Sequence, residues 1–186
     1  MNRVFRTAMA YLVTGFSCLA ALAVAILVPR SRAQRAFDRV IATWSRGVLR
    51  TVGIRYQIRG QVPTKPPFVL ISNHQSLLDV LAVLAACPEV RIIAKAELFR
   101  VPLFGPAMRS AGFLKIDRAN RERAWQTIRD AAQEVRRGAS IMLFPEGTRS
   151  QDGALRPFKK GAFALAAESR VPVVPMAIYG TQLLLP

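Results

Sequence analysis

The chain opens with a long uncharged run. Residues 7–29 contain no charged side chain, and a run of this length matches the hydrocarbon thickness of a bilayer. A signal peptide is the alternative interpretation, since Arg3 and Arg6 precede the run. Against it, the run is long for that role, and "PRSRAQR" follows where small residues would mark a cleavage site. We therefore predict a membrane-anchoring helix.

Residues 33–51 carry apolar side chains at helical spacing, with arginines between them. The apolar positions are Phe37, Val40, Ile41, Trp44, Val48 and Leu49. This pattern predicts a basic amphipathic helix that lies on a membrane surface. A helix packed on a globular domain, with its basic face in solvent, fits the same periodicity. The sequence leaves both alternatives open.

The break "PTKPP" at 63–67 divides the chain into an N-terminal membrane-associated part, 1–60, and a globular part, 61–186. Just before the break, residues 54–59 alternate like a half-buried strand. Beyond it, strand patterns occur at 68–72, 91–95, 113–116, 140–144 and 171–178. Helical patterns occur at 77–86, 159–169 and about 120–137. This alternation predicts an α/β fold with a mixed, largely parallel sheet flanked by helices. The prolines in 171–178 predict that this strand lies at an edge or ends early.

The charge of the chain is strongly positive, at +16, and its pI is about 11.5. Residues 1–60 hold ten arginines, no lysine and one acid, Asp38. Positive residues beside a membrane segment stay on the cytoplasmic side and attract anionic head groups. A nucleic-acid binder is the competing interpretation, but the sequence has no zinc-finger spacing, aromatic RNA-binding motif or lysine-rich tail. Membrane lipid, an acidic carrier protein or an anionic substrate explains the charge better, and we expect no nucleic-acid partner.

The only histidine, His74, lies where a predicted strand turns into a predicted helix, five residues before Asp79. A neutral imidazole can take a proton from a hydroxyl near neutral pH. A carboxylate bonded to its other ring nitrogen fixes the tautomer. This pairing requires His74 to lie in the turn before the helix and to fold back over its first turn. The structural alternative is a capping box formed by Ser76 and Asp79, and both interpretations can hold together.

Two other polar clusters follow predicted strands, where ligand sites gather in α/β sheets. In "FPEGTRS", residues 144–150, Arg149 offers a planar fork for phosphate oxygens and Glu146 can hold a hydroxyl. A turn with a local Glu–Arg ion pair is the alternative. In "GFLKIDR", residues 112–118, strand alternation sends Lys115 and Asp117 to one side and Arg118 to the other, unless the strand ends before Arg118. A solvated strand end is the alternative there.

Further along, Lys159 and Lys160 stand at an expected helix start, where cations oppose the helix dipole, so a bound anion would explain them. One histidine and the isolated Cys18 and Cys87 make neither a metal site nor a disulfide framework. The sequence also lacks a G-x-S-x-G nucleophile elbow and a G-x-x-x-x-G-K-[ST] phosphate loop. A general base, several phosphate-sized cations and a membrane anchor remain.

Four segments of the chain, taken in order, resemble the four blocks of the 1-acylglycerol-3-phosphate (lysophosphatidic acid) acyltransferase family. The first is Asn73-His74 with Asp79, similar to an N-H-x4-D block, and the others are 112–118, 144–150 and the proline-bearing 171–178. The resemblance covers about residues 65–180. It implies a glycerolipid-acyltransferase-like fold, and it favours an N-terminal two-helix motif that enters one leaflet.

This resemblance implies transfer of an acyl chain from an acyl-carrier-protein or coenzyme A thioester to the sn-2 hydroxyl of lysophosphatidic acid. The product is phosphatidic acid, a step of phospholipid biosynthesis, and the active site would face the cytoplasm. His74 would deprotonate the hydroxyl, Asp79 would orient His74, and neither a metal nor a cofactor is implied. The implied substrate-binding residues are Asn73, Lys115, Arg118, Glu146, Gly147, Thr148 and Arg149.

Two departures from the family pattern bear on these expectations. Lys115 stands where an apolar residue is expected, which bears on acceptor recognition. The chain also stops soon after the fourth block, so we expect the α/β domain to lack its C-terminal part. Alternative acceptors are glycerol 3-phosphate, a lyso-ornithine lipid or another lysophospholipid. A non-catalytic membrane-surface binding protein is the alternative from a different class, but it has little need of a positioned base.

Overall fold

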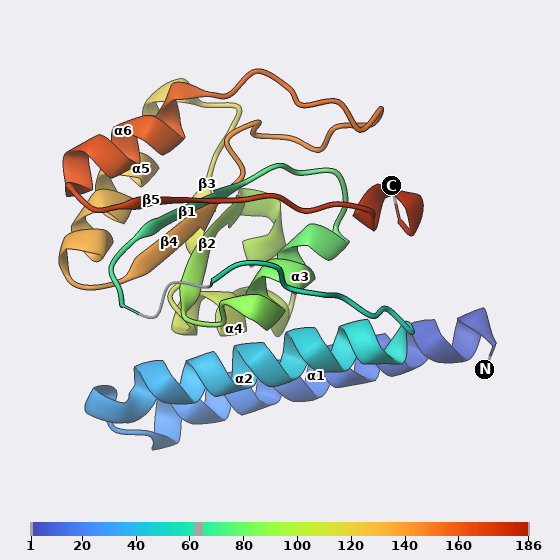
Figure 1. Ribbon diagram of the computed structural model, residues 1–186. Helices are drawn as coiled ribbons and strands as arrows, with labels where there is room; N and C mark the ends of the chain where they lie inside the picture. Colours follow the sequence, from blue (N-terminus) through green and yellow to red (C-terminus); the bar gives the residue numbers. More distant parts are fainter. Residues whose placement is uncertain (1, 62–64, 186) are drawn as a thin grey trace. The chain divides into compact units, whose positions relative to one another are not determined.

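The computed structural model describes residues 2–61 and 65–185, and the chain divides into two compact units (Figure 1). The helical unit comprises the described residues of Met1–Val62, Val80–Glu89 and Glu97–Gly112. The sheet unit comprises those of Pro63–Asp79, Val90–Ala96 and Phe113–Pro186. The sequence pattern places everything after residue 60 in one globular part, whereas two segments of that part pack with the N-terminal helices.

Two long helices, α1 (Arg3–Leu27) and α2 (Arg30–Thr51), form an antiparallel hairpin in the helical unit (Figure 1). The turn between them follows from Pro29, because the residue before a proline avoids helical geometry and Val28 is extended. Pro29 then starts α2, and its carbonyl accepts the first backbone hydrogen bonds of that helix. Between the helices, the Trp44 indole N–H donates to Thr14 Oγ1 at 3.1 Å.

The predicted amphipathic helix is present, and it starts three residues earlier than expected. Its buried side chains are Phe37, Ile41, Ser45, Val48 and Leu49. The apolar stripe is therefore packed inside the protein, and the arginines of α2 are exposed. In contrast, α1 keeps large apolar side chains exposed along its length, and it is long and apolar enough to cross a membrane.

A short helix, α4 (Phe104–Ser110), packs on α1 and was not expected from the sequence, where two prolines and a glycine interrupt the pattern. It follows the turn η1 (Ala96–Arg100). The predicted strand at 54–59 is wrong: these residues form no strand in the structure. Gly53, at φ +82°, ends α2, and the Ile54 N–H donates back to the Leu49 carbonyl. The sequence of 54–59 alternates, but no strand among the described residues pairs with this segment.

Five parallel strands form the sheet, in the order β3-β2-β4-β1-β5. They are β1 (Val69–Ser72), β2 (Val90–Lys95), β3 (Leu114–Ile116), β4 (Ser140–Leu143) and β5 (Val173–Met176). The prediction that the proline-bearing strand lies at an edge is confirmed, because β5 pairs only with β1 among the described strands. The predicted largely parallel α/β sheet is also confirmed.

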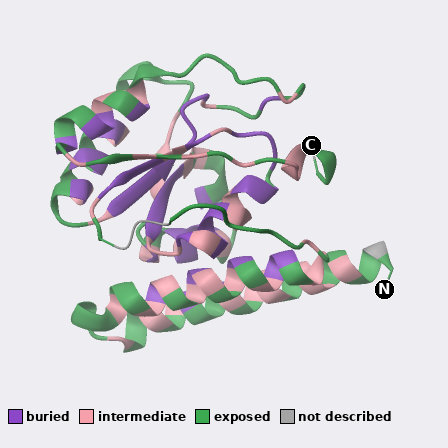
Figure 2. Cartoon of the chain, viewed as in Figure 1, coloured by how far each residue is buried: buried purple, intermediate pink, exposed green. Residues whose placement is uncertain are grey.

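Two helices, α5 (Arg121–Arg136) and α6 (Lys160–Ser169), cover one face of this sheet. The core there is built from Val69, Ile93, Ile141 and Leu143 of the strands, and from Ile128, Val135 and Leu165 of the helices. Figure 2 shows how completely the central strands are buried. Since all strands run in parallel, their carboxyl ends meet at one edge, and the loops that follow β1, β3, β4 and β5 lie there.

Candidate functional site

The first site element is the pair formed by His74 and Asp79. His74 follows β1, and Asp79 lies in the first turn of α3 (Leu78–Ala86). His74 Nδ1 lies 2.9 Å from Asp79 Oδ2, and the Asp79 side chain is fully buried. The loop therefore folds back over the first turn of the helix, as the pairing requires.

The Asp79 carboxylate also caps its own helix. Its Oδ2 accepts hydrogen bonds from the backbone N–H groups of Gln75 at 2.6 Å and Ser76 at 2.8 Å. Ser76 Oγ accepts from the Leu78 N–H at 3.1 Å, and Thr181 Oγ1 donates to Asp79 Oδ1 at 2.5 Å. The capping and the pairing interpretations of Asp79 are thus both correct.

These contacts decide the charge of Asp79. Burial acts to raise the pKa of its carboxyl, but hydrogen bonds from His74, Thr181 and the backbone of Gln75 and Ser76 outweigh burial and hold the pKa below its usual value. An ionised carboxylate is an acceptor only. The hydrogen of a neutral His74 ring therefore lies on Nδ1, and Nε2 carries the lone pair that a general base uses.

The His74 ring and backbone are held from the loop after β4. The ring stacks on Phe144 with a centroid distance of 3.8 Å and an interplanar angle of 12°. The His74 N–H donates to Glu146 Oε1 at 2.8 Å, and the His74 carbonyl accepts from the Ser150 N–H at 2.8 Å. The side chain still keeps 11% of its surface exposed, so the ring is fixed in position and yet accessible from outside.

Glu146 is buried, and both of its oxygens bind backbone groups. Oε2 accepts from the Arg156 N–H at 3.0 Å, while Oε1 is occupied by His74. The geometry favours a supporting role for Glu146 over direct contact with a hydroxyl. In the same turn, Thr148 and Arg149 are exposed.

Gly147 connects this turn to two cationic side chains. Its carbonyl accepts a hydrogen bond from Arg118 Nη1 at 2.5 Å. Its φ is +72°, and a Cβ at this position would lie 2.8 Å from Lys159 Nζ. Only glycine allows both the backbone angle and the approach of Lys159. The turn thus brings Arg118 from the loop after β3 close to Lys159 before α6.

A cavity of about 450 Å³ opens beside this turn in the sheet unit. Its apolar walls include Ile116, Trp125, Ile128, Leu143 and Phe144. Four cationic side chains also line it: Arg118, Arg121, Lys159 and Lys160. Among the described residues, no Asp or Glu lines the cavity. Phe144 both lines the cavity and stacks on His74, so one ring connects the cavity to the His74–Asp79 pair, although His74 is not itself a lining residue.

Of the seven predicted substrate-binding residues, Arg118 and Gly147 line the cavity. The other five, Asn73, Lys115, Glu146, Thr148 and Arg149, are not among its lining residues. The Asn73 amide makes two hydrogen bonds with the backbone of Ile178, each 2.8 Å long, and so fixes the segment after β5. Lys115 is exposed on β3 and is not among the residues that line the cavity, whereas Ile116 and Arg118 are. Because β3 ends at Ile116, strand alternation does not extend to Arg118, and the loop after the strand positions that side chain.

The sequence interpretation missed Arg121, Ser150 and Thr181. Arg121 and Thr181 belong to no block of the resemblance, and only the folded chain shows that they lie by the cavity and the Asp79 carboxylate. Ser150 is inside a recognised block, but its contribution is a backbone N–H, which no sequence pattern reveals. Within residues 2–61 and 65–185, no group of three or more His, Cys, Asp or Glu side chains could hold a metal ion.

Comparisons with known proteins agree with this geometry. The family model described as Acyltransferase matches residues 53–179. The 1-acyl-sn-glycerol-3-phosphate acyltransferase BAT2, chloroplastic, of Brassica napus is 42% identical over 120 residues, which are 64% of this chain and 35% of the relative. The 1-acyl-sn-glycerol-3-phosphate acyltransferase alpha of Homo sapiens is 39% identical over 134 residues, 70% of this chain and 47% of the relative.

A solved structure extends the similarity across both units. The crystal structure of the 1-acyl-sn-glycerophosphate (LPA) acyltransferase PlsC from Thermotoga maritima matches with a TM-score of 0.86 and 27% identity. The match covers 98% of this chain and 75% of that one. The chain spans about a third to a half of the length of the curated relatives that it matches. The resemblance seen in the sequence is confirmed: the chain belongs to the acyltransferase family.

Proposed function

We propose that this chain transfers an acyl group from a thioester to the sn-2 hydroxyl of 1-acylglycerol 3-phosphate, giving phosphatidic acid. The observation that carries the proposal is the His74–Asp79 pair, 2.9 Å apart, whose imidazole stacks on Phe144. Phe144 in turn lines a cavity with apolar walls and four cations. The names of the relatives support the same reaction and acceptor.

In this reaction His74 Nε2 takes the proton of the acceptor hydroxyl as its oxygen attacks the thioester carbonyl carbon. The C–O ester bond forms, the C–S bond breaks, and the imidazolium returns its proton to the departing thiolate. Asp79 stabilises the imidazolium and fixes the ring. The thioester already supplies a good leaving group, so the proposed transfer uses neither a metal nor a separate cofactor.

The acceptor phosphate fits the cationic side of the cavity. Arg118 of the cavity presents a planar fork that matches phosphate oxygens, and Lys159 adds a point charge beside the Gly147 turn. Arg149, exposed in that turn but not a lining residue, offers a second fork. The apolar walls around Trp125 suit the acyl chain of the acceptor. The donor is a thioester of coenzyme A or acyl carrier protein, both anionic and suited to a protein of charge +16.

We place the protein on a membrane, with its active site on the cytoplasmic face. The exposed apolar surface of α1 supports attachment to the bilayer. Arginines follow α1 at positions 30, 32, 35 and 39, and such residues stay on the cytoplasmic side. In line with the family resemblance, we propose that the hairpin enters one leaflet.

The test compares acyl transfer by the full, detergent-purified chain with that of His74→Asn. Asparagine can still donate a hydrogen bond towards Asp79 but cannot act as a base. Phosphatidic acid from the wild type and none from the variant is the expected result. Equal turnover by both proteins would refute the role of His74. The same assay identifies the substrates. Turnover is compared between the coenzyme A and acyl-carrier-protein thioesters as donors, and between lysophosphatidic acid, glycerol 3-phosphate and a lyso-ornithine lipid as acceptors.

A membrane-surface binding protein makes a different prediction in this assay. It would bind vesicles that contain lysophosphatidic acid, yet neither the wild type nor His74→Asn would release a thiol from either donor. Thiol release is therefore measured together with vesicle binding, and binding without release would overturn the enzymatic proposal.

A further inference from the structure

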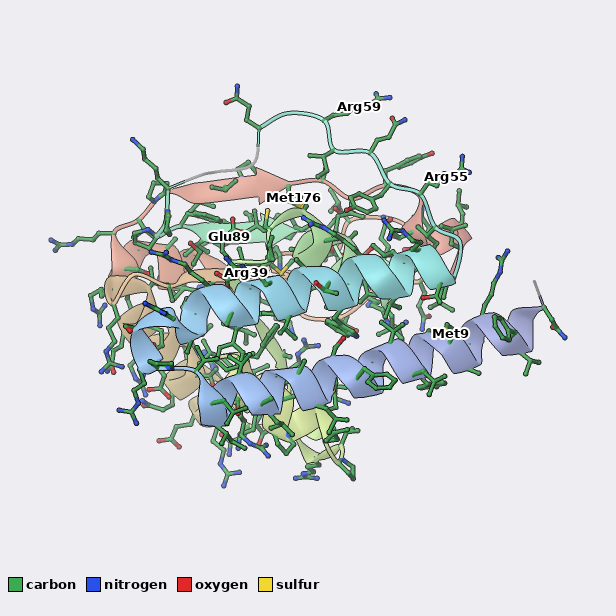
Figure 3. The ribbon with its side chains drawn as sticks, turned by 90° about the horizontal axis from the view of Figure 1, so that it is seen from below. Met9, Arg39, Arg55, Arg59, Glu89 and Met176 are labelled. Carbon is green, nitrogen blue, oxygen red and sulfur yellow. The ribbon has the colours of Figure 1, made fainter. Side chains whose placement is uncertain are left out.

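A second cavity, of about 660 Å³, lies entirely within the helical unit. Four arginines line it: Arg6 of α1, Arg46 and Arg50 of α2, and Arg55 just beyond α2. Figure 3 labels Arg55 on the segment that leaves the end of α2. The remaining lining residues are Leu49, Gly53, Ile54 and Tyr56. We call this the arginine pocket, and among the described residues no Asp or Glu lines it.

The guanidinium groups of the pocket have donors to spare. Arg46 donates twice to the Ala85 carbonyl, at 3.1 and 2.9 Å, and Arg6 Nη1 donates to the Val52 carbonyl at 3.4 Å. Arg6 Nε is buried and has no hydrogen-bond partner among residues 2–61 and 65–185. The exposed side chains of Arg50 and Arg55 donate no hydrogen bond to any residue that the structure describes. The pocket thus offers one ligand several guanidinium donors that no described residue uses, one of them buried.

The backbone is shaped around one of these arginines. Gly53 has a φ of +82°, and a Cβ there would lie 3.0 Å from Arg6 Nη1. A side chain at this position would crowd the Arg6 guanidinium, so the glycine lets Arg6 reach the pocket.

Charge indicates the class of ligand. Four positive charges around one cavity repel each other unless an anion lies among them. Guanidinium forks match the oxygens of phosphate with paired, charge-assisted hydrogen bonds. The chemistry of the pocket therefore favours a phosphate group over a carboxylate-bearing peptide or a neutral ligand.

The surroundings indicate the source of that phosphate. The first turn of α1 leaves Val4 and Phe5 exposed at 73% and 50%, and Tyr56 of the pocket is 40% exposed. These residues continue the apolar surface of the helix that is long enough to cross a bilayer. A phosphate bound in the pocket would have space for acyl chains along α1.

We infer that the arginine pocket binds the phosphate of an anionic phospholipid, as a lipid site built by the helical unit alone. This inference goes beyond the proposed reaction, because it concerns a resident or regulatory lipid and none of the residues around His74. It holds or fails independently of acyl transfer.

The test uses the full chain in neutral detergent, titrated with phosphatidylglycerol, with bound lipid counted by native mass spectrometry. The pocket variant is Arg50→Gln with Arg55→Gln, chosen because both side chains are exposed and donate no hydrogen bond to a described residue. The matched control is Arg32→Gln with Arg35→Gln, two exposed arginines of α2 outside the pocket. Both variants lose the same charge, so general attraction to anionic lipid falls equally.

We expect the wild type and the control to retain one phosphatidylglycerol, and the pocket variant to bind it about tenfold more weakly or worse. Phosphatidylcholine serves as the second lipid and should not be retained. Equal loss in both variants would overturn the inference, because it would show general charge attraction only. Inorganic phosphate that binds in the pocket as tightly as phosphatidylglycerol would overturn the lipid assignment.

Discussion

At the scale of single residues, Asp79 connects the fold to the proposed chemistry. One carboxylate holds the His74 ring, caps α3 and accepts a hydrogen bond from the Thr181 hydroxyl, in the segment after β5. We expect Asp79→Asn to lower kcat by about 1,000-fold or more, on the scale seen when the carboxylate of a Ser-His-Asp site is replaced. The measurement is kcat for lysophosphatidic acid. Asp152→Asn, at an exposed carboxylate that also accepts backbone and hydroxyl hydrogen bonds, is the control and should keep its kcat.

The same carboxylate makes stability depend on pH. The pKa of Asp79 lies below its usual value in the folded protein and returns to about 3.9 on unfolding. The resulting stabilisation is complete above about pH 4 and is lost as the pH falls through the folded pKa. We therefore expect the difference in unfolding free energy between wild type and Asp79→Asn to narrow from pH 5 to pH 2. Urea unfolding across that range measures it, and a constant difference would contradict the prediction.

Gly147 offers a residue-scale test of the cavity. Alanine there must adopt a φ of +72° and meet the Lys159 side chain, whereas Gly153, at φ +78°, faces open space. Gly147→Ala and Gly153→Ala therefore share the backbone strain of about 1–2 kcal/mol, and only the first displaces Lys159. We expect KM for lysophosphatidic acid to rise severalfold in Gly147→Ala alone. Equal KM values in the two variants would remove Lys159 from the acceptor site.

At the scale of elements, hydrophobic patterns predicted the helices and strands whose positions depend on local sequence. The five strands and the helices α3, α5 and α6 lie where hydrophobic spacing puts them, because each buries a face with its own period. The 54–59 segment and α4 show the limit of this reasoning. An alternating segment becomes a strand only with a pairing neighbour, and a helix seven residues long leaves too short a pattern to detect.

The helix α4 depends on one close approach. A Cβ on Gly105 would lie 2.2 Å from the Phe99 carbonyl oxygen, and the same carbonyl accepts a hydrogen bond from Arg109. We expect Gly105→Ala to lower the unfolding free energy by about 3 kcal/mol or more, as overpacking does when backbone must move. Gly15→Ala in α1, where the Cβ has open space, should instead be neutral or stabilising by up to about 1 kcal/mol. Denaturant unfolding of both variants distinguishes steric overlap from a general effect of alanine.

At the scale of the whole molecule, the roles of the candidate site residues became visible only in the folded chain. The sequence indicated His74, Asp79 and the turn at 144–150 because each lies beside a strand end, and parallel strands bring these ends to one edge. It did not indicate which groups would face substrate. Glu146 and Asn73 bind backbone instead, a distinction that depends on tertiary contacts between segments 72 and 105 residues apart.

For the whole protein, a salt wash distinguishes two contributions to membrane attachment: the apolar face of α1 and the attraction of arginines to anionic lipid. Salt at about 1 M shortens the Debye length to about 3 Å and releases proteins held only by arginines at the surface. The exposed apolar face of α1 is insensitive to such screening. We therefore expect the chain to remain in the membrane pellet after a salt wash and to leave it in detergent. Phe16→Glu with Leu19→Glu, at exposed positions of α1, should make the protein salt-extractable. Release of the wild type by salt alone would show that the arginines, and not α1, hold the protein to the bilayer.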